Sequence, residues 1–177
     1  MNGCLPQKGF DPATVRLTLN RWIVGKTAEA VARANEALEQ FKFNEAADTI
    51  YHFTWGTFCD WYLEFIKPTL QDDGADAAAR TETRAAAAWA LDQILRVLHP
   101  IMPFITAELW QRLDAARLRP LAAESWPEIP IALRDPKAEA EADWLVELIS
   151  AVRAVRSEMN VPAAARIALR HRGASAE

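Results

Sequence analysis

Cysteine, histidine and glycine are scarce in this chain, and each shortage excludes a class of protein. The two cysteines, Cys4 and Cys59, lie far apart and neither belongs to a CxxC pair, so a zinc site or a redox dithiol is not supported. The six glycines form no phosphate-binding loop, and no HExxH, ExxH or GxSxG pattern occurs. The sequence therefore offers no catalytic constellation, and we expect no cofactor or metal in this segment.

Long uncharged runs are also missing. The two longest, residues 49–59 and 97–107, have eleven residues each, whereas a helix that crosses a bilayer needs about 20. The N-terminus lacks the basic start and apolar run of a secretory signal. We therefore expect a cytoplasmic protein with no membrane segment.

Positive charge is concentrated at the two ends of the chain. The net charge is −4, yet residues 1–43 carry +2 and residues 151–177 carry +3, which leaves −9 for residues 44–150. This asymmetry argues against a general polyanion binder but permits a local basic face on an acidic body. A randomly mixed, solvated surface explains the charges equally well.

Apolar residues at three- and four-residue spacing predict an all-α protein. With 51% hydrophobic and 25% charged residues, the chain can bury a core and stay soluble. Asp11-Pro12 is a typical helix opening, and we expect a first helix from there to about Phe41. Its predicted core stripe consists of Val15, Leu19, Trp22, Ile23, Ala30, Ala34 and Leu38.

A second helix is expected to begin after Asn44 and to end at Pro68. Further aromatic residues lie beside its apolar face, so the helix is apolar over much of its circumference. Such a helix is usually central in its domain. The predicted buried face consists of Ala47, Ile50, Thr54, Phe58, Trp61 and Phe65.

Two more helices should follow an exposed loop over residues 71–79. Thr81 is the expected start of an alanine-rich helix with a core stripe of Ala88, Leu91, Ile94, Leu95 and Leu98. Two prolines in the segment 99–103 should break it. Pro103 then begins a fourth helix to about Ala116, which we expect to bury Phe104, Ile105, Leu109, Trp110 and Leu113.

The C-terminal part begins with a proline-rich linker. Four prolines between residues 120 and 136 exclude helix over most of this stretch, which we expect to wrap the bundle, anchored by Trp126. Asp135-Pro136 opens a fifth helix, and residues 166–170 alternate with a period of two, as in a half-buried strand. We therefore predict a bundle over residues 1–136. Residues 137–177 should form a connecting helix and the first strand of a small, truncated α/β subdomain.

The remaining titratable residues fit structural roles better than catalytic ones. The three histidines fall on three separate elements, and His99 is typical of a helix end. Asp60 and Glu64 are four apart, a spacing that suits paired carboxylates. Beside a tryptophan on a bundle helix, however, carboxylates are more often hydrogen-bond partners for indole or Arg groups. We predict no acid–base pair there.

Aromatic residues interleaved with basic ones are candidates for RNA binding. Proteins read single-stranded RNA by stacking bases on aromatic rings while Lys and Arg meet the phosphates. Phe41, Lys42 and Phe43 have this pattern at the predicted turn between the first two helices, and Arg21 and Lys26 lie on the preceding helix. The alternative is that the two phenylalanines staple the turn into the core.

A second basic pair lies near the C-terminus. Arg153 and Arg156 are three residues apart on the fifth predicted helix, so they share a face. They could hold RNA phosphates, or they could pair with acids of the acidic body. Because surface ion pairs contribute little to stability, stability alone does not require these arginines.

Three segments of the chain resemble the anticodon-binding domain of valyl-tRNA synthetases, which are class I aminoacyl-tRNA synthetases. They are residues 19–23 (LNRWI), 53–64 (FTWGTFCDWYLE) and 98–110 (LHPIMPFITAELW). The third is shared with isoleucyl and leucyl enzymes, whereas CDWYLE and residues 152–161 (VRAVRSEMNV) are closer to the valyl group. The resemblance covers about residues 15–172.

The resemblance implies an all-α bundle of about five helices, with the start of a small α/β piece at its C-terminal end. It also implies binding of the valine tRNA anticodon stem and loop, within a monomeric enzyme that joins valine to its tRNA using ATP. The catalytic HIGH and KMSKS signatures and the editing insertion are missing from this sequence. This segment alone should therefore be inactive and should depend on the catalytic domain of a longer chain.

For individual residues, the resemblance favours core positions for Trp61, Tyr62 and Trp110. The first two helices face the RNA in this group of enzymes, which supports Arg21, Lys26, Phe41, Lys42 and Phe43 as tRNA-binding residues. Two alternatives stay open: an isoleucyl- or leucyl-type domain, and a helical protein-interaction bundle with no RNA role.

Overall fold

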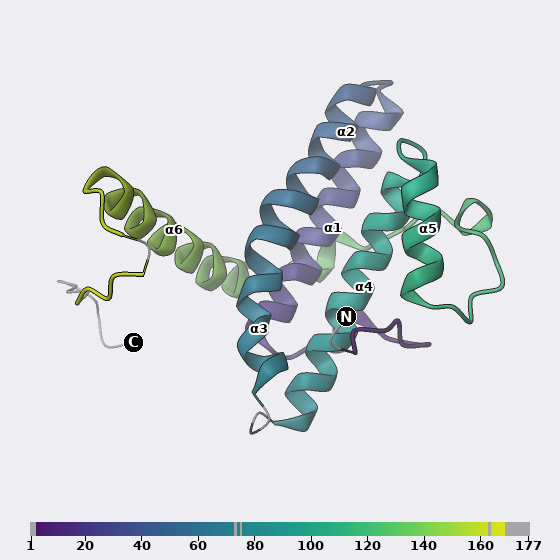
Figure 1. Ribbon diagram of the computed structural model, residues 1–177. Coiled ribbons are helices and arrows are strands. Elements are labelled where there is room, and N and C mark those ends of the chain that lie inside the picture. Colours follow the sequence, from purple (N-terminus) through teal and green to yellow (C-terminus); the bar gives the residue numbers. More distant parts are fainter. Residues whose placement is uncertain (1–2, 73, 75, 163, 169–177) are drawn as a thin grey trace. The chain divides into compact units, whose positions relative to one another are not determined.

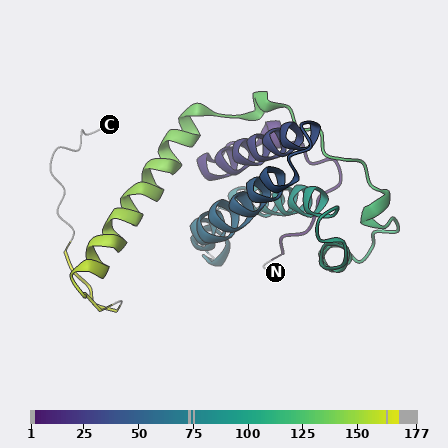
Figure 2. The same ribbon diagram turned by 90° about the horizontal axis from the view of Figure 1, so that it is seen from above.

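Six α-helices account for most of the residues described by the computed structural model, which are 3–72, 74, 76–162 and 164–168. The helices are α1 (Thr18–Glu39), α2 (Phe43–His52), α3 (Leu63–Gln71), α4 (Ala77–Leu98), α5 (Pro103–Leu113) and α6 (Pro136–Glu158). A π-helical segment, Phe53–Tyr62, joins α2 to α3 without a break, and this long rod lies beside α1 (Figure 1). α4 packs against the pair, and α5 covers the other side of α4 (Figure 2). The predicted all-α bundle is confirmed.

The first helix begins later than predicted. Asp11 does cap a turn, because its Oδ1 accepts the N–H of Ala13 at 2.9 Å, but only a short 3-10 turn, Pro12–Thr14, follows. The next backbone N–H groups, of Arg16 and Leu17, donate to Glu82 Oε1 of α4 at 3.0 and 2.9 Å. A carboxylate from another helix thus satisfies the donors just before α1. The chain stays extended there until α1 begins at Thr18.

A buried polar network ties α1 to the rod and to α4. The hydroxyl of Tyr62 donates to Asn20 Oδ1 at 2.9 Å, and Asn20 Nδ2 donates to Glu82 Oε1 at 2.9 Å and to Thr83 Oγ1 at 3.2 Å. Tyr62 and Asn20 have no exposed surface, so each lost partner would leave a buried polar atom unsatisfied. Burial also raises the pKa of Tyr62, which keeps its hydroxyl a donor.

The π-helical segment changes which face of the rod is buried. Its hydrogen bonds reach back five residues, as from the N–H of Leu63 to the carbonyl of Phe58, so one more residue fits into the turn. The prediction of Ala47, Thr54, Trp61 and Phe65 as core residues was wrong by one position: all four are only partly buried, and the last three lie in or after the π-helical segment. The buried residues are Ala46, Ile50, Phe53, Phe58, Tyr62 and Ile66.

Pro68 does not end the rod, contrary to the prediction. It lies inside α3, which continues to Gln71. The missing N–H of a proline costs one helical hydrogen bond, and Pro68 sits so close to the end that little helix depends on it. Its own carbonyl accepts the N–H of Asp72 and closes the last turn.

α4 carries many small side chains, so neighbouring helices can pack close to it. It begins at Ala77, four residues before the predicted start, because Asp76 caps it through the N–H groups of Ala78 and Ala79. A run of small side chains then lets α1 and the rod pack near its axis. The fully or almost fully buried residues on α4 include Ala85, Ala86, Ala87, Ala88, Ala90, Ile94 and Leu95.

The apolar face predicted for α5 is buried only in part. Trp110 and Leu113 are 3% and 2% exposed and pack with Leu95 and Leu121. Phe104, in contrast, is 90% exposed. Ile105 and Leu109 are 48% and 43% exposed, so the prediction was wrong for these three residues within the described bundle. The apolar residues of α5 form more than one face, and α4 covers only one of them.

The linker over residues 120–136 runs along the bundle without α-helix, as predicted. It contains two 3-10 turns, Leu121–Ala123 and Ile131–Leu133, and Trp126 Nε1 donates to Asn35 Oδ1 of α1 at 2.7 Å. At Gly25 the linker passes so close to α1 that an added Cβ would lie 3.2 Å from the Cα of Arg134. A side chain at position 25 would therefore displace the linker by a few tenths of an ångström and would push the Glu139 carboxylate aside.

The chain divides into two compact units, Met1–Asp143 and Trp144–Glu177, with the division inside α6. The first turns of α6 belong to the bundle, since Ala138 and Ala142 are buried. The predicted boundary after residue 136 and the α/β subdomain stay predictions. Residues 166–168 form no strand, and the rest of the predicted strand lies outside the described residues. None of the described helices is long and apolar enough to cross a membrane.

We predict that Tyr62→Phe destabilises the bundle by about 1 to 3 kcal/mol, because it leaves the buried Asn20 carbonyl oxygen without its donor. The measurement is urea unfolding followed by circular dichroism. Tyr51→Phe is the matched control, since Tyr51 is 58% exposed, and it should change the unfolding free energy by less than about 0.5 kcal/mol. Equal unfolding midpoints for the two variants would show that the network does not stabilise the fold.

Candidate nucleic-acid interface

α1 ends in a hydrogen-bonded turn that holds Phe41 in a left-handed backbone conformation. The N–H of Lys42 donates to the carbonyl of Ala37 at 2.8 Å, and the N–H of Phe41 donates to that of Leu38 at 3.0 Å. This pair of bonds is the Schellman motif, which needs a positive φ at the residue after the cap. Phe41 occupies that position with φ 57°. Glycine is usual there, because a side chain costs roughly 1 to 2 kcal/mol in this region.

Two phenylalanine rings project into solvent at this turn. Phe41 is 79% exposed, and Phe43, the first residue of α2, is 63% exposed. Their ring centroids lie 6.4 Å apart with the planes at 77°. Lys42 between them is half-exposed, with Nζ 3.5 Å from Glu45 Oε2, which is a weak surface pair. The alternative that both rings staple the turn into the core is therefore wrong.

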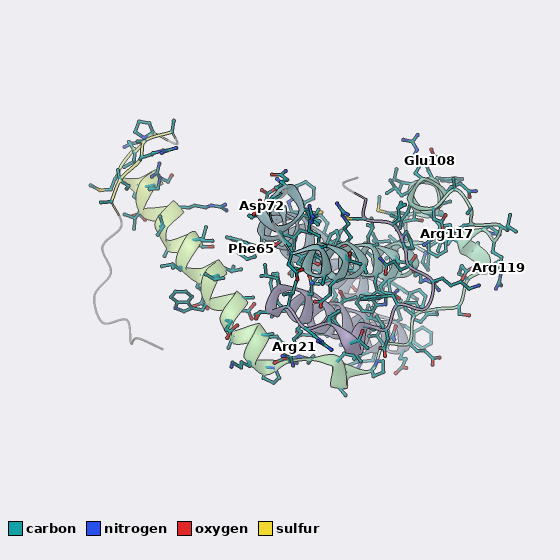
Figure 3. The ribbon with its side chains drawn as sticks, turned by 90° about the horizontal axis from the view of Figure 1, so that it is seen from below. Arg21, Phe65, Asp72, Glu108, Arg117 and Arg119 are labelled. Carbon is teal, nitrogen blue, oxygen red and sulfur yellow. The ribbon has the colours of Figure 1, made fainter. Side chains whose placement is uncertain are left out.

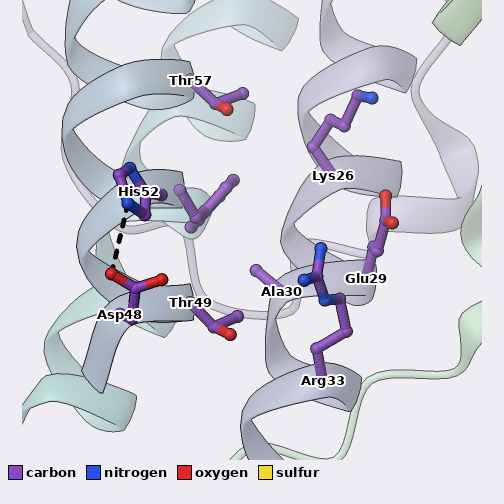
Figure 4. A pocket seen from close by; sticks show the side chains of 9 residues that line it. Lys26, Glu29, Ala30, Arg33, Asp48, Thr49, His52 and Thr57 are labelled. Atoms are coloured by element: carbon purple, nitrogen blue, oxygen red, sulfur yellow. Dashed lines mark ion pairs between the residues drawn. The ribbon is translucent and has the colours of Figure 1, made fainter. Parts of the chain in front are cut away.

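A polar groove between α1 and α2 leads toward this turn. Two adjoining clefts of about 270 and 260 Å³ share Arg33 and Asp48 as lining residues, and the second reaches Lys42. In Figure 4, Arg33 of α1 lies across the first cleft from Asp48 and His52 of α2, which form an ion pair at 3.2 Å. Lys26 of α1 also lines the first cleft, but of the two basic side chains only Arg33 reaches the second cleft beside Lys42, where Glu36 and Glu45 are further lining residues.

Arg33 differs in its contacts from the other basic residues of α1. It is exposed, and within the described part of the chain it forms no ion pair. It precedes Phe41 by eight residues, which is about 12 Å along a helix. A phosphate next to a base stacked on Phe41 would therefore be within reach of Arg33. Arg33 is not among the residues that the sequence pattern predicts to bind RNA, because no aromatic residue lies beside it in the sequence.

Arg21 and Lys26, both predicted to bind RNA, pair with acids instead. The guanidinium of Arg21, labelled in Figure 3, pairs with Asp135 at the start of α6. Lys26 Nζ lies 2.9 Å from Asp143 Oδ2, and Asp143 also accepts Trp22 Nε1 at 3.0 Å. Lys26 is about 15 residues from Phe41, or about 22 Å along α1. The structure does not bring these two residues together with the turn.

Arg153 and Arg156, the other predicted residues, belong to the second compact unit. The guanidinium of Arg156 donates to the carbonyls of Pro162 at 2.8 Å and Ala165 at 3.2 Å, so it holds the turn that follows α6. Arg153 is exposed one turn earlier. A role for these two residues in RNA binding stays a prediction.

The other titratable candidates have structural partners. His99 Nδ1 lies 2.7 Å from Thr106 Oγ1, and that hydroxyl lies 2.8 Å from the Met102 carbonyl oxygen, so His99 is part of the hydrogen-bonded end of α4. Burial raises the pKa of both thiols, Cys4 and Cys59, which makes neither a ready nucleophile. Among the described residues, no cluster of three or more His, Cys, Asp or Glu could hold a metal ion.

Comparison with known proteins decides between the alternatives. A family model described as "Anticodon-binding domain of tRNA ligase" matches residues 20–170. The chain belongs to this family. It is 51% identical to the valine-tRNA ligase of Caulobacter vibrioides and 42% identical to that of Bradyrhizobium diazoefficiens, over all of its own length in both cases. The resemblance to valyl enzymes is confirmed, and the isoleucyl, leucyl and non-RNA alternatives are not supported.

The anticodon-binding domain is a small part of these relatives. The chain spans 20% of the Caulobacter ligase, 22% of the Bradyrhizobium ligase and 19% of the ligase of Rhizorhabdus wittichii, to which it is 45% identical. In each relative about four fifths of the polypeptide therefore lies outside the region that matches. The activity of the complete relatives is therefore distinct from the binding properties of this domain.

We predict that the Asp135 carboxylate makes stability depend on pH in the acid range. The N–H of Ala138, more than the nearby Arg21, holds the pKa of Asp135 below its ordinary value. A carboxyl with a lowered folded pKa contributes stability above its unfolded pKa, and this contribution is lost as pH falls through the folded value, below about pH 4. Asp135→Asn keeps a cap but loses the charge, so it should be less stable than wild type at neutral pH.

Thermal melts across the acid range test this prediction. The difference between Asp135→Asn and wild type should shrink as the pH falls below about 4. Asp60→Asn, at an exposed position of the rod, is the control and should change stability little at any pH. A difference that is constant with pH would contradict the role given to the Asp135 charge.

Proposed function

We propose that this chain is the anticodon-binding part of a valine-tRNA ligase, and that Phe41 and Phe43 stack on bases of the valine anticodon loop. The observation that carries the proposal is Phe41 itself. It is 79% exposed and holds a backbone conformation in which glycine would be less strained. Strained backbone positions cluster at functional sites, and an exposed aromatic ring at such a position is suited to stacking on a base.

The energies are consistent with such a role. Left-handed backbone at Phe41 costs roughly 1 to 2 kcal/mol, whereas stacking of one base on an aromatic ring contributes about 1 to 3 kcal/mol. The ring thus lowers the stability of the free domain, and bound RNA offsets that loss. Phe43 stands on the first turn of α2, so the second ring is held by a helix rather than by a flexible loop.

Phosphates would be met by Lys42 and Arg33. Lys42 lies between the two rings, and its pair with Glu45 is exposed and easily exchanged. Arg33 lies about two helical turns away along the groove. Arg21 and Lys26 would each have to give up an acid partner to contact RNA, so we assign them a secondary part. Arg153 and Arg156 remain candidates for contacts with another stretch of the tRNA.

For the whole protein, we propose the activity carried by the names of its relatives, the joining of valine to its tRNA. ATP would act at a catalytic domain outside this segment, and the present domain would select the tRNA. We further propose a cytoplasmic, monomeric enzyme. The proposed activity is supported by identities of 42 to 51% to valine-tRNA ligases over the full length of the chain.

We predict that Phe41→Gly stabilises the free domain and weakens RNA binding. Removing the strained side chain should raise the free energy of unfolding by about 1 kcal/mol. Loss of one stacking partner should raise the Kd for a valine anticodon hairpin about 5- to 100-fold. Urea unfolding and fluorescence titration at low salt measure the two effects on the same protein.

Phe104→Ala is the matched control, because Phe104 is a phenylalanine that is 90% exposed on a different helix, α5. It should leave the Kd unchanged. Isoleucine and leucine anticodon hairpins should bind more weakly than the valine hairpin to the wild-type domain. If Phe41→Gly and Phe104→Ala bound the valine hairpin with equal affinity, Phe41 would not contact the anticodon.

The salt dependence of binding gives a separate prediction for Arg33. Each phosphate contact adds about 0.7 to 0.9 to the slope of log K against log salt concentration. Arg33→Ala should therefore reduce that slope by about 0.7 while leaving the discrimination between hairpins intact. Arg112→Ala is the control, since Arg112 pairs with Glu108 on the outer side of α5. An unchanged slope for Arg33→Ala would remove Arg33 from the interface.

A further inference from the structure

An apolar patch covers the corner between α4 and α5. Its residues are Ile101 at 46% exposure, Met102 at 49%, Phe104 at 90%, Ile105 at 48% and Leu109 at 43%. Met102, Ile105 and Leu109 are spaced by three and four residues, so they share one side of the helix, and Phe104 lies on the first turn about 100° around the axis from Ile105. Together they expose an area on the order of several hundred Å², the size at which an apolar patch marks a contact site.

The patch is presented by a rigid support. On the inner side of α5, Trp110 is buried under the guanidinium of Arg117, whose Cζ lies 3.4 Å from the ring centroid. Arg117 in turn pairs with Asp92 of α4. At the corner, Thr106 is bonded to both His99 and the Met102 carbonyl. The backbone of the patch is thus held from behind, and a partner would find it already ordered.

The chemistry of the patch fits a protein partner and not RNA. None of its five residues is basic, and the charged neighbours on α5, Glu108 and Arg112, neutralise each other. Glu108 lies on the outer side of α5 in Figure 3. Phosphates would gain nothing here, because RNA binding depends on Lys and Arg. The core of a protein interface, by contrast, is rich in Phe, Met and aliphatic residues and poor in charge.

We infer that this corner is the surface on which the domain docks against the remainder of a valine-tRNA ligase. The occupant is an apolar protein surface of the same enzyme, because the relatives are about five times as long as the segment that they share with this chain. The sequence pattern of α5, which predicts burial of Phe104, Ile105 and Leu109, is then satisfied in the assembled enzyme. The inference rests on the proposed ligase, but not on the contact between Phe41 and RNA.

Hydroxyl-radical footprinting with mass spectrometry tests the inference. The isolated chain is compared with the Caulobacter ligase in which the matching segment has been replaced by this chain. Oxidation of Met102 and Phe104 should fall about tenfold in the full-length protein, because an interface core excludes water. Phe41 and Leu118, which are 79% and 97% exposed, are internal controls, and neither should be protected to that extent without RNA.

Two results would overturn the inference. Equal oxidation of Phe104 in both proteins would show that the corner stays exposed in the ligase. Protection in the isolated chain that grows with concentration would show that a second copy of the chain is the occupant. If the chimaera does not fold, the same comparison at the aligned positions of the intact Caulobacter ligase decides. Because no RNA is present, failure of the anticodon contact would not affect the outcome.

Discussion

The hydrogen-bonded chain from Tyr62 through Asn20 to Glu82 fixes the geometry on which the rest of the domain depends. It joins the rod, α1 and α4 at a point with no exposed surface on Tyr62 or Asn20. A buried network of this kind tolerates little displacement, since any shift leaves a polar atom unsatisfied. With the lower ends of the three helices fixed, α1 and α2 run together to the far end, where the turn at Phe41 is presented (Figure 1).

The helices themselves could be predicted from apolar spacing, but the face of the rod that is buried could not. The spacing predicts burial of Trp61 and Phe65, whereas the π-helical segment buries Tyr62 and Ile66. No residue in the range 53–62 signals the extra residue per turn, and the segment packs against α1, which is distant in the sequence. The start of α1 was missed for a similar reason: the Glu82 carboxylate, about 65 residues away, captures the backbone donors before Thr18.

The aromatic residues of the candidate site could be predicted from the sequence, because they are neighbours in it. The accessibility of the basic residues could not, because it depends on ion pairs with distant segments. The pattern Phe41-Lys42-Phe43 indicates an aromatic and basic turn, and both rings are exposed. The acids of the linker and α6 determine which basic residues of α1 are accessible to RNA. Arg21 and Lys26 pair with such acids, whereas Arg33 forms no ion pair within the described chain. The exposed face of α5 has the same origin, since its expected partner lies outside this domain.

The most direct test of the account is an NMR titration of the ¹⁵N-labelled domain with a valine anticodon hairpin at low salt. If the α1–α2 turn contacts the anticodon loop, the largest amide shift changes occur at Phe41, Lys42 and Phe43, with a smaller group around Arg33, and the α5 corner at residues 101–109 is unaffected. Largest changes at that corner, or saturable binding with no change at the α1–α2 turn, would contradict this contact.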